Sequence, residues 1–202
     1  NKTVRSHFNY HWKYGITPDE FFNYEPQLNK KFNDYSFTGY KLINQHESWL
    51  SIEPAVGCSN GCTYCVLNTT YNNKAHCSTL YTTPETISTK LKSSKFYQKD
   101  SVLAMFNYTD SLLPQNRQYL LRTLQNLNEN YISNYICIPT KTAFDIEFAE
   151  NIFSTYPKDK LIFLISMSGL STKFEPKIYG DKLFRTMEML RQQNVSVIHY
   201  WR

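Results

Sequence analysis

Three cysteines stand close together in the segment CSNGCTYC, at positions 58–65. Three residues separate Cys58 from Cys62, and two separate Cys62 from Cys65. Thiolates on one short loop can converge on a soft metal centre, and Gly57 and Gly61 supply the backbone freedom that such a turn needs. Three thiolates are one ligand short of a closed zinc site or an ordinary four-cysteine cluster. The segment therefore predicts a metal centre with one open coordination position, as catalysis at a metal requires.

A structural zinc site is the alternative interpretation of the same cysteines. His76 or Cys77 would then supply the fourth ligand. Zinc sites usually take their ligands as two short pairs, whereas these two residues follow Cys65 at a distance and only one of them is needed. The open metal centre is the favoured interpretation, and zinc remains the second.

The spacing Cys58-x3-Cys62-x2-Cys65, with the aromatic Tyr64 before the last cysteine, resembles the cluster-binding loop of the radical S-adenosylmethionine (SAM) superfamily. The resemblance implies that Cys58, Cys62 and Cys65 hold a [4Fe-4S] cluster whose free iron binds SAM. It implies that one electron, from a donor such as flavodoxin or ferredoxin, cleaves SAM to methionine and a 5′-deoxyadenosyl radical that abstracts hydrogen from a substrate. Tyr64 would line the cluster or the adenine.

Other candidate SAM contacts follow three later apolar segments, and their motifs are similar to the spore photoproduct lyase-like branch of the superfamily. The resemblance assigns oxygen acceptors, a lysine and ribose or carboxylate contacts to Thr109, Asp110, Lys141, Ser166, Ser168, Glu175 and Arg185. Simpler roles stay open: Asp110 can cap a helix, and Lys141 and Arg185 can be solvent-exposed. Among single residues, Cys137 is expected to be a small buried hydrophobe. Either His199 or Tyr200 is expected to face the mouth of the barrel that the resemblance implies.

The same branch suggests a nucleic acid substrate and a reaction like a DNA lesion repair lyase. Asn107 stands where that lyase keeps a hydrogen-donating cysteine, so modification of a peptide or of RNA is the alternative. A zinc-stabilised, non-catalytic binding module is a further alternative. The formal net charge of +5 permits an acidic partner without requiring one.

Short apolar runs alternate with helix-like windows from residue 48 onward, which is typical of an α/β fold around a parallel sheet. Apolar runs predict strands in 48–55, 101–108, 134–139, 161–167 and 195–201. Helical periodicity predicts helices in 82–97, 114–130, 143–156 and 181–194. These units argue for a barrel or partial barrel, or alternatively for an open doubly wound sheet. The resemblance implies the first: a partial (β/α)6 TIM-type barrel of parallel strands, truncated after the fifth strand.

Two segments are expected from the composition. We expect residues 1–46 to form an irregular N-terminal extension with a short helix. The resemblance implies that residues 47–202 form the radical SAM core barrel, incomplete at its C-terminus. A chain that starts without methionine and stops after an apolar run suggests a piece of a longer protein. With no apolar run near the roughly 18 residues of a membrane span and no signal peptide, we expect a cytoplasmic protein without membrane contact.

Overall fold

The computed structural model describes residues 42–45, 48–65, 67 and 78–200 of the chain. Within them, a six-stranded sheet has the order β1-β2-β5-β6-β7-β8, and a small two-stranded sheet pairs β3 with β4. The strands of the six-stranded sheet are β1 (Ile43–Gln45), β2 (Leu50–Ile52), β5 (Leu103–Met105), β6 (Ile136–Thr140), β7 (Leu161–Ser166) and β8 (Ser196–Tyr200). The small sheet consists of β3 (Ala55–Val56) and β4 (Thr79–Leu80).

The strands β2, β5, β6, β7 and β8 run parallel and lie side by side in chain order. Four of them fall within the expected strand segments and β6 extends one residue beyond its segment, so the expected α/β class with a mostly parallel sheet is confirmed. Their order contains no reversal, whereas a doubly wound sheet is defined by one. The antiparallel β1 at the edge of the sheet was not expected, and it lies inside the segment predicted to be irregular.

Each crossover between parallel strands carries a helix, as the periodicity predicts. The helices are α5 (Pro84–Ser93), α6 (Arg117–Glu129), α7 (Ile146–Thr155) and α8 (Gly180–Gln192), with short 3-10 turns η2 (Pro114–Asn116) and η3 (Lys158–Lys160). Thr83 caps α5 ahead of Pro84, close to the start of the expected helical range 82–97. Asp145 caps α7 by accepting the Phe148 amide at 3.0 Å.

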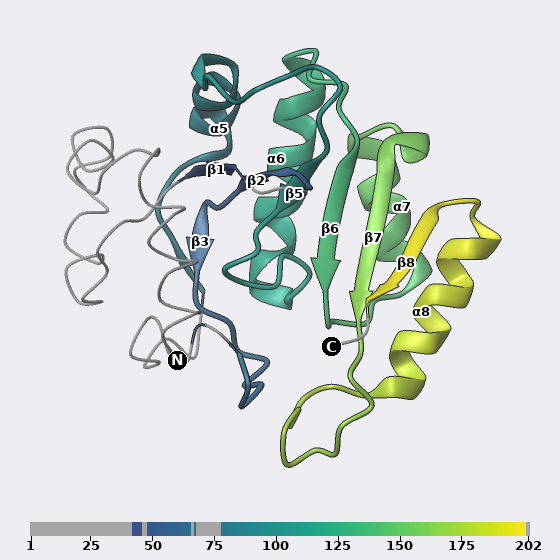
Figure 1. The fold of residues 1–202 in the computed structure, drawn as a ribbon. Coiled ribbons are helices and arrows are strands. Elements are labelled where there is room, and N and C mark those ends of the chain that lie inside the picture. The colour runs from purple at the N-terminus through teal and green to yellow at the C-terminus, as the bar shows by residue number, and fades with distance from the viewer. Residues whose placement is uncertain (1–41, 46–47, 66, 68–77, 201–202) are drawn as a thin grey trace.

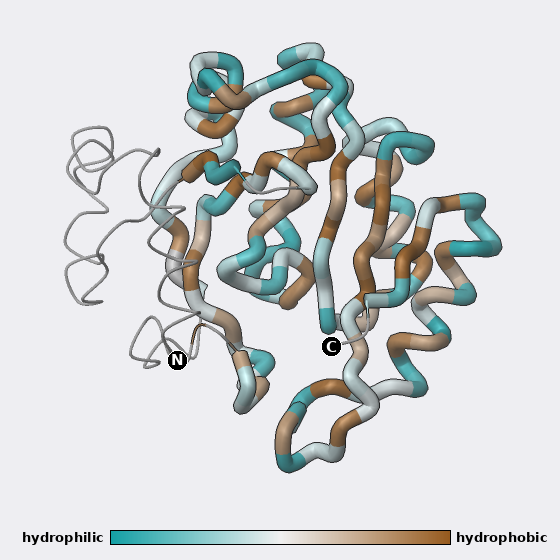
Figure 2. The backbone as a smooth tube through the Cα atoms, viewed as in Figure 1, coloured by the Kyte–Doolittle hydropathy of each residue, from teal (hydrophilic) through white to brown (hydrophobic). Residues whose placement is uncertain are grey.

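The two faces of the sheet are packed differently. On one face, large strand residues such as Met105, Ile138 and Phe163 join a core with Leu124 of α6 and Leu190 of α8. The helices α6 and α7 lie behind the sheet in Figure 1, and Figure 2 shows apolar residues along β6 and β7. On the other face, a smaller buried cluster consists of Ala104, Cys137 and Leu164. Cys137 is therefore the small buried hydrophobe that the sequence predicts. No helix among the described residues is long and apolar enough to cross a bilayer.

Candidate functional site at the carboxyl ends of the strands

The cysteine loop follows β3 and depends on two glycines. Gly57 and Gly61 have φ values of 98° and 71°, in the left-handed region that residues with a Cβ atom adopt at a cost. This confirms the backbone role expected for both. The Gly57 amide donates to the Tyr108 carbonyl at 3.0 Å, and the Thr63 amide donates to the Phe174 carbonyl at 2.9 Å. The loop is thereby fixed between the end of β5 and the segment that leads from β7 to α8.

The three cysteines of this loop are not joined in disulfides, and their thiols lie within electrostatic reach of one another. Cys62 is buried, and Cys58 and Cys65 are half-buried. Burial raises the pKa of the Cys58 thiol to about 12, with a further contribution from the Asp110 carboxylate. Burial also raises the pKa of the Cys62 thiol, although the ammonium of Lys141 opposes the rise. Among the described residues, no group of three or more His, Cys, Asp or Glu side chains is arranged to hold a metal ion.

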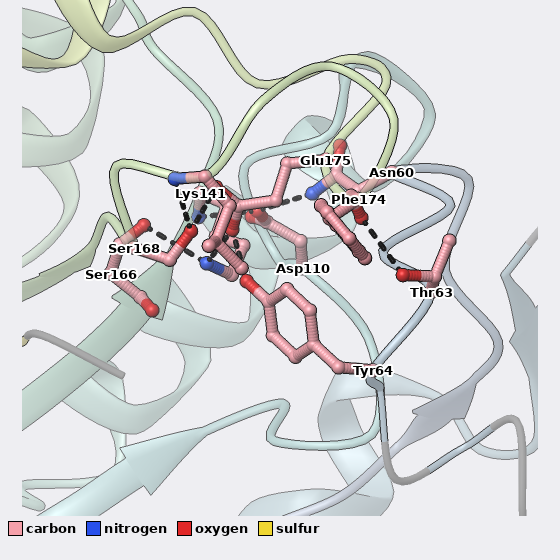
Figure 3. Close-up of polar contacts among 10 residues, drawn as sticks. Asn60, Thr63, Tyr64, Asp110, Lys141, Ser166, Ser168, Phe174 and Glu175 are labelled. Atoms are coloured by element: carbon pink, nitrogen blue, oxygen red, sulfur yellow. Dashed lines mark hydrogen bonds and ion pairs between the residues drawn. The ribbon is translucent and has the colours of Figure 1, made fainter.

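Asp110 ties the cysteine loop to the ends of β5 and β6 (Figure 3). Its carboxylate is 5% exposed. It accepts five hydrogen bonds, from Asn60 Nδ2 (3.0 Å), Lys141 N (2.8 Å), Thr142 Oγ1 (2.8 Å), Thr140 Oγ1 (2.8 Å) and Leu112 N (3.0 Å). Donors within the protein thus occupy both oxygens, which places Asp110 as a positioning residue beneath the loop.

Thr109 holds the start of the same loop through a second set of contacts. Its Oγ1 lies 2.7 Å from Ser78 Oγ and accepts from Asn116 Nδ2 at 3.2 Å. Ser78 Oγ in turn donates to the carbonyl of Gly57 at 3.0 Å. The hydroxyl of Thr109 is therefore linked through Ser78 to Gly57, the residue that precedes Cys58.

Glu175 is the centre of a cluster that contains five of the predicted cofactor residues. Lys141 Nζ lies 2.6 Å from Glu175 Oε1, and the Tyr64 hydroxyl donates to the same oxygen. Ser168 Oγ donates to Glu175 Oε2 at 2.5 Å, and Lys141 Nζ also donates to the Ser166 carbonyl at 3.3 Å. Figure 3 shows the side chains of Tyr64, Lys141, Ser168 and Glu175 directed toward one another from the cysteine loop, the end of β6 and the segment after β7.

The electrostatics of this cluster favour its charged form. Burial acts to raise the pKa of Glu175, but hydrogen bonds from Lys141, Ser168 and Tyr64 outweigh it and lower the pKa. Burial acts to lower the pKa of Lys141, and contacts with Glu175 and Tyr64 reverse this, so that the pKa is raised. The pKa of Tyr64 is raised by burial and by Glu175. A carboxylate and an ammonium group are thus held together in a largely buried position.

Arg185 is not brought to this cluster. It is exposed on α8 and lines a separate pocket with Arg117 and Lys182. This position agrees with the simpler role of a residue on the outer face of an amphipathic helix. The helical pattern predicts the buried side of α8 correctly, with Leu183 and Leu190 in the core, but it does not specify which neighbours the exposed side meets.

The choice between His199 and Tyr200 is decided by the register of β8. Tyr200 pairs with Ser166, and His199 pairs with Ile165, which belongs to the helix-facing core. Side chains of paired residues share a face of a sheet. Tyr200 therefore lies on the same face as Ser166, at the end of the strands. His76 and Cys77, the ligands of the zinc alternative, lie outside the described residues.

Several residues of the site were not predicted from the sequence. Asn60, Ser78, Asn116 and Thr140 carry the contacts that hold the loop. Asn60 lies inside the cysteine segment and Thr140 lies next to Lys141. Their positions beside predicted site residues could therefore have identified them from the sequence. Ser78 and Asn116 are common polar residues without a motif, and only the fold brings them to Thr109.

Comparison with known proteins adds no relative: no family model, no curated protein and no solved structure matches the chain. The candidate site therefore rests on its own geometry. That geometry consists of a glycine-turned loop of three thiols, a carboxylate that anchors the loop, and a buried ion pair beside it.

Proposed function

We propose that this chain is a radical SAM enzyme with a partial (β/α)6 barrel, cut after the fifth parallel strand. The observation that carries the proposal is the three-cysteine loop at the carboxyl ends of parallel strands, beside the buried Lys141–Glu175 pair. The unreversed order of the parallel strands supports the barrel. The small side chains of Ala104 and Cys137 on the face without helices suit the inner side of such a barrel.

The donor set fits a [4Fe-4S] cluster in type and in number. Cys58, Cys62 and Cys65 offer three sulfur ligands, which leaves one iron free to bind SAM. When bound and reduced, the cluster supplies the electron that cleaves SAM to methionine and a 5′-deoxyadenosyl radical. The positive φ values of Gly57 and Gly61 allow the loop to turn around such a group.

The ion pair matches the amino-acid part of SAM, which carries an ammonium and a carboxylate group. In exchange for their present contact with each other, Lys141 Nζ would bind the carboxylate and Glu175 would accept from the ammonium group, because opposite charges in a buried setting form strong hydrogen bonds. Ser166 Oγ is buried without a hydrogen-bond partner among the described residues. This hydroxyl is therefore available to a ribose, and Tyr64 would line the cluster or the adenine.

The substrate that we propose is a nucleic acid, in a lesion repair-like reaction, with an electron donor such as flavodoxin or ferredoxin in the cytoplasm. Asn107 is half-buried at the end of β5 and offers no thiol as a hydrogen donor. Modification of RNA or a peptide is the alternative reaction on the same cofactor. A zinc-stabilised binding module is the alternative without catalysis.

Anaerobic reconstitution with iron and sulfide tests the proposal. We expect a brown protein that, once reduced, releases 5′-deoxyadenosine from SAM, and we expect Cys58→Ala, Cys62→Ala and Cys65→Ala each to abolish cluster and product. Cys137→Ala is the matched control, because Cys137 is buried away from the loop and should keep both. Stoichiometric zinc without SAM cleavage would support the binding module instead. Retention of cluster and cleavage in the three variants would refute the proposed ligands.

A further inference from the structure

We propose that the pocket between α8 and the start of α6 binds the phosphate backbone of a single-stranded nucleic acid. The cationic pocket, as we call it, is lined by Arg117, Lys182 and Arg185, together with Asp145. The inference deepens the proposed function, on which it rests for the substrate class. Its test measures binding alone and does not depend on SAM chemistry.

The size and composition of the pocket suit phosphate groups. Its volume is about 420 Å³, and Thr186 and Met189 form part of its wall. Three cations face one carboxylate, which leaves an excess of positive charge. Asp145 is itself engaged as the N-cap of α7. Phosphate contacts from lysine and arginine supply most of the sequence-independent affinity for nucleic acids.

Arg117 is held in place, whereas Arg185 is available. Arg117 Nε donates to the Leu112 carbonyl at 3.1 Å, and its guanidinium lies 4.4 Å from the centroid of the Phe148 ring. Arg185 forms no ion pair or hydrogen bond with any of the described residues. One guanidinium is therefore oriented in advance, and the other can adapt to a ligand.

An exposed aromatic side chain lies beside these cations. Tyr179, which precedes α8, is 56% exposed. The Lys182 ammonium lies 4.9 Å from the centroid of the Tyr179 ring. Proteins that bind single strands combine a cationic groove with aromatic rings on which unpaired bases stack. The combination favours a single strand over a small phosphate ligand.

The pocket is joined to the candidate site by one short segment. Ala143 and Phe144 line the pocket, and they directly follow Lys141 and Thr142, which bond to Asp110. A nucleic acid whose phosphate backbone lies in the cationic pocket would therefore pass close to the carboxyl ends of the parallel β-strands. This is the place where the proposed chemistry needs a base.

Fluorescence anisotropy of the 202-residue chain with a labelled single-stranded oligonucleotide of about 12 nucleotides tests the proposal, since site sizes are about 4–16 nucleotides. We expect the double variant Lys182→Gln/Arg185→Gln to bind about tenfold more weakly at 0.1 M salt. Its slope of log affinity against log salt should fall by about 1–2. Arg191→Gln is the control, because Arg191 is exposed on the same helix and does not line the pocket.

Two further arms distinguish the ligand. Tyr179→Ala should weaken binding of the oligonucleotide several-fold with little change in salt slope, because stacking involves no counterion release. Pyrophosphate should compete only at concentrations at least about 100-fold above those of the oligonucleotide. Competition at equal concentrations would assign the pocket to a small phosphate ligand and overturn the proposal. Equal affinities and slopes for the double variant and Arg191→Gln, or no binding by the wild type, would also overturn it.

Discussion

Three carboxyl groups are almost completely buried near the ends of the strands. The protein offsets the cost of burying each of them in a different way. Asp110 accepts five hydrogen bonds, and Glu175 pairs with Lys141. Glu53, at 0% exposure, accepts a hydrogen bond from the Tyr108 amide at 3.1 Å and has no cation paired with it among the described residues. A buried carboxyl without a cation tends to hold its proton. Of these three carboxyl groups, Glu53 is thus the one whose negative charge the fold disfavours most.

We predict that Glu53 makes the protein less stable as the pH rises. Burial raises the pKa of Glu53 from 4.5 to about 8, although the Tyr108 amide partly opposes the rise. Between these two values the unfolded chain releases the proton and the folded chain keeps it, so stability falls with increasing pH. Glu53→Gln should remove most of this slope and stabilise the protein by about 2–4 kcal/mol at pH 7.

Urea unfolding between pH 4.5 and pH 8 measures this effect. Glu150→Gln, an exposed change on α7, is the control and should leave the slope of the wild type intact. If Glu53→Gln keeps that slope, the buried carboxyl is not its source.

We predict that Asp110→Asn weakens the fold and loosens the cysteine loop. The amide nitrogen would face either the Lys141 amide or the Leu112 amide, and each of these now donates to a carboxylate oxygen. Donors that face donors leave buried groups unsatisfied, so we expect a loss of about 2–4 kcal/mol. Asp100→Asn, an exposed change, should lose almost nothing. Equal free energies of unfolding for the two variants would show that Asp110 does not anchor the loop.

At the scale of elements, the sequence predicts the long periodic segments well and the short ones poorly. The spacing of the leucines at 120, 121, 124 and 127 predicts one buried face of α6. Three of them, Leu120, Leu124 and Leu127, are completely buried, and Leu121 is half-buried. β1 has only three residues, Ile-Asn-Gln, and forms by pairing with β2, so its local sequence carries no strand pattern. Pairing with a distant segment, rather than local propensity, creates such a strand.

The ends of α6 and α8 provide a prediction at this scale. Both helices end in a Schellman motif, with Ile132 N bonded to Leu127 O and Val195 N bonded to Leu190 O. Tyr131 and Asn194 occupy the left-handed position of each motif, with φ values of 58° and 57°. Glycine is favoured there, and asparagine is tolerated far better than a large side chain.

We therefore predict that Tyr131→Gly stabilises the protein by about 1 kcal/mol, and that Asn194→Gly stabilises it less. The loss of the Tyr131 ring removes little packing, because the residue is 94% exposed. Thermal unfolding should show a rise in melting temperature of about 2–4 °C for Tyr131→Gly. A drop in melting temperature would mean that the ring stabilises the fold more than the backbone strain weakens it.

At the scale of the molecule, the candidate site depends on segments that are far apart in the sequence. The cysteine loop and the residues around Lys141 and Glu175 could be predicted, because each lies in a segment that follows an apolar strand, and parallel strands end at one edge. Their exact partners could not. The position of Arg185 beside Arg117 depends on how α8 packs near the start of α6, and helical periodicity contains no information about this.

The sheet itself provides the last prediction. β6 and β7 lie between neighbours on both sides, and their helix-facing residues Ile136, Ile138, Leu161, Phe163 and Ile165 are completely buried. β8 has one described neighbour, and Ile198 and Tyr200 on its other face are 50% and 40% exposed. Local opening costs less where few apolar groups are buried.

We predict that hydrogen exchange at β8 is about 100-fold faster than at β6 and β7, since each factor of ten corresponds to about 1.4 kcal/mol of opening free energy. The amides of Ile136–Thr140 and Leu161–Ser166 should exchange only through global unfolding, so their opening free energies should equal the unfolding free energy from urea. Mass spectrometry of peptides from the exchanged protein measures both. Exchange of β8 at the same rate as β7 would show that the edge of the sheet is stabilised as strongly as its centre.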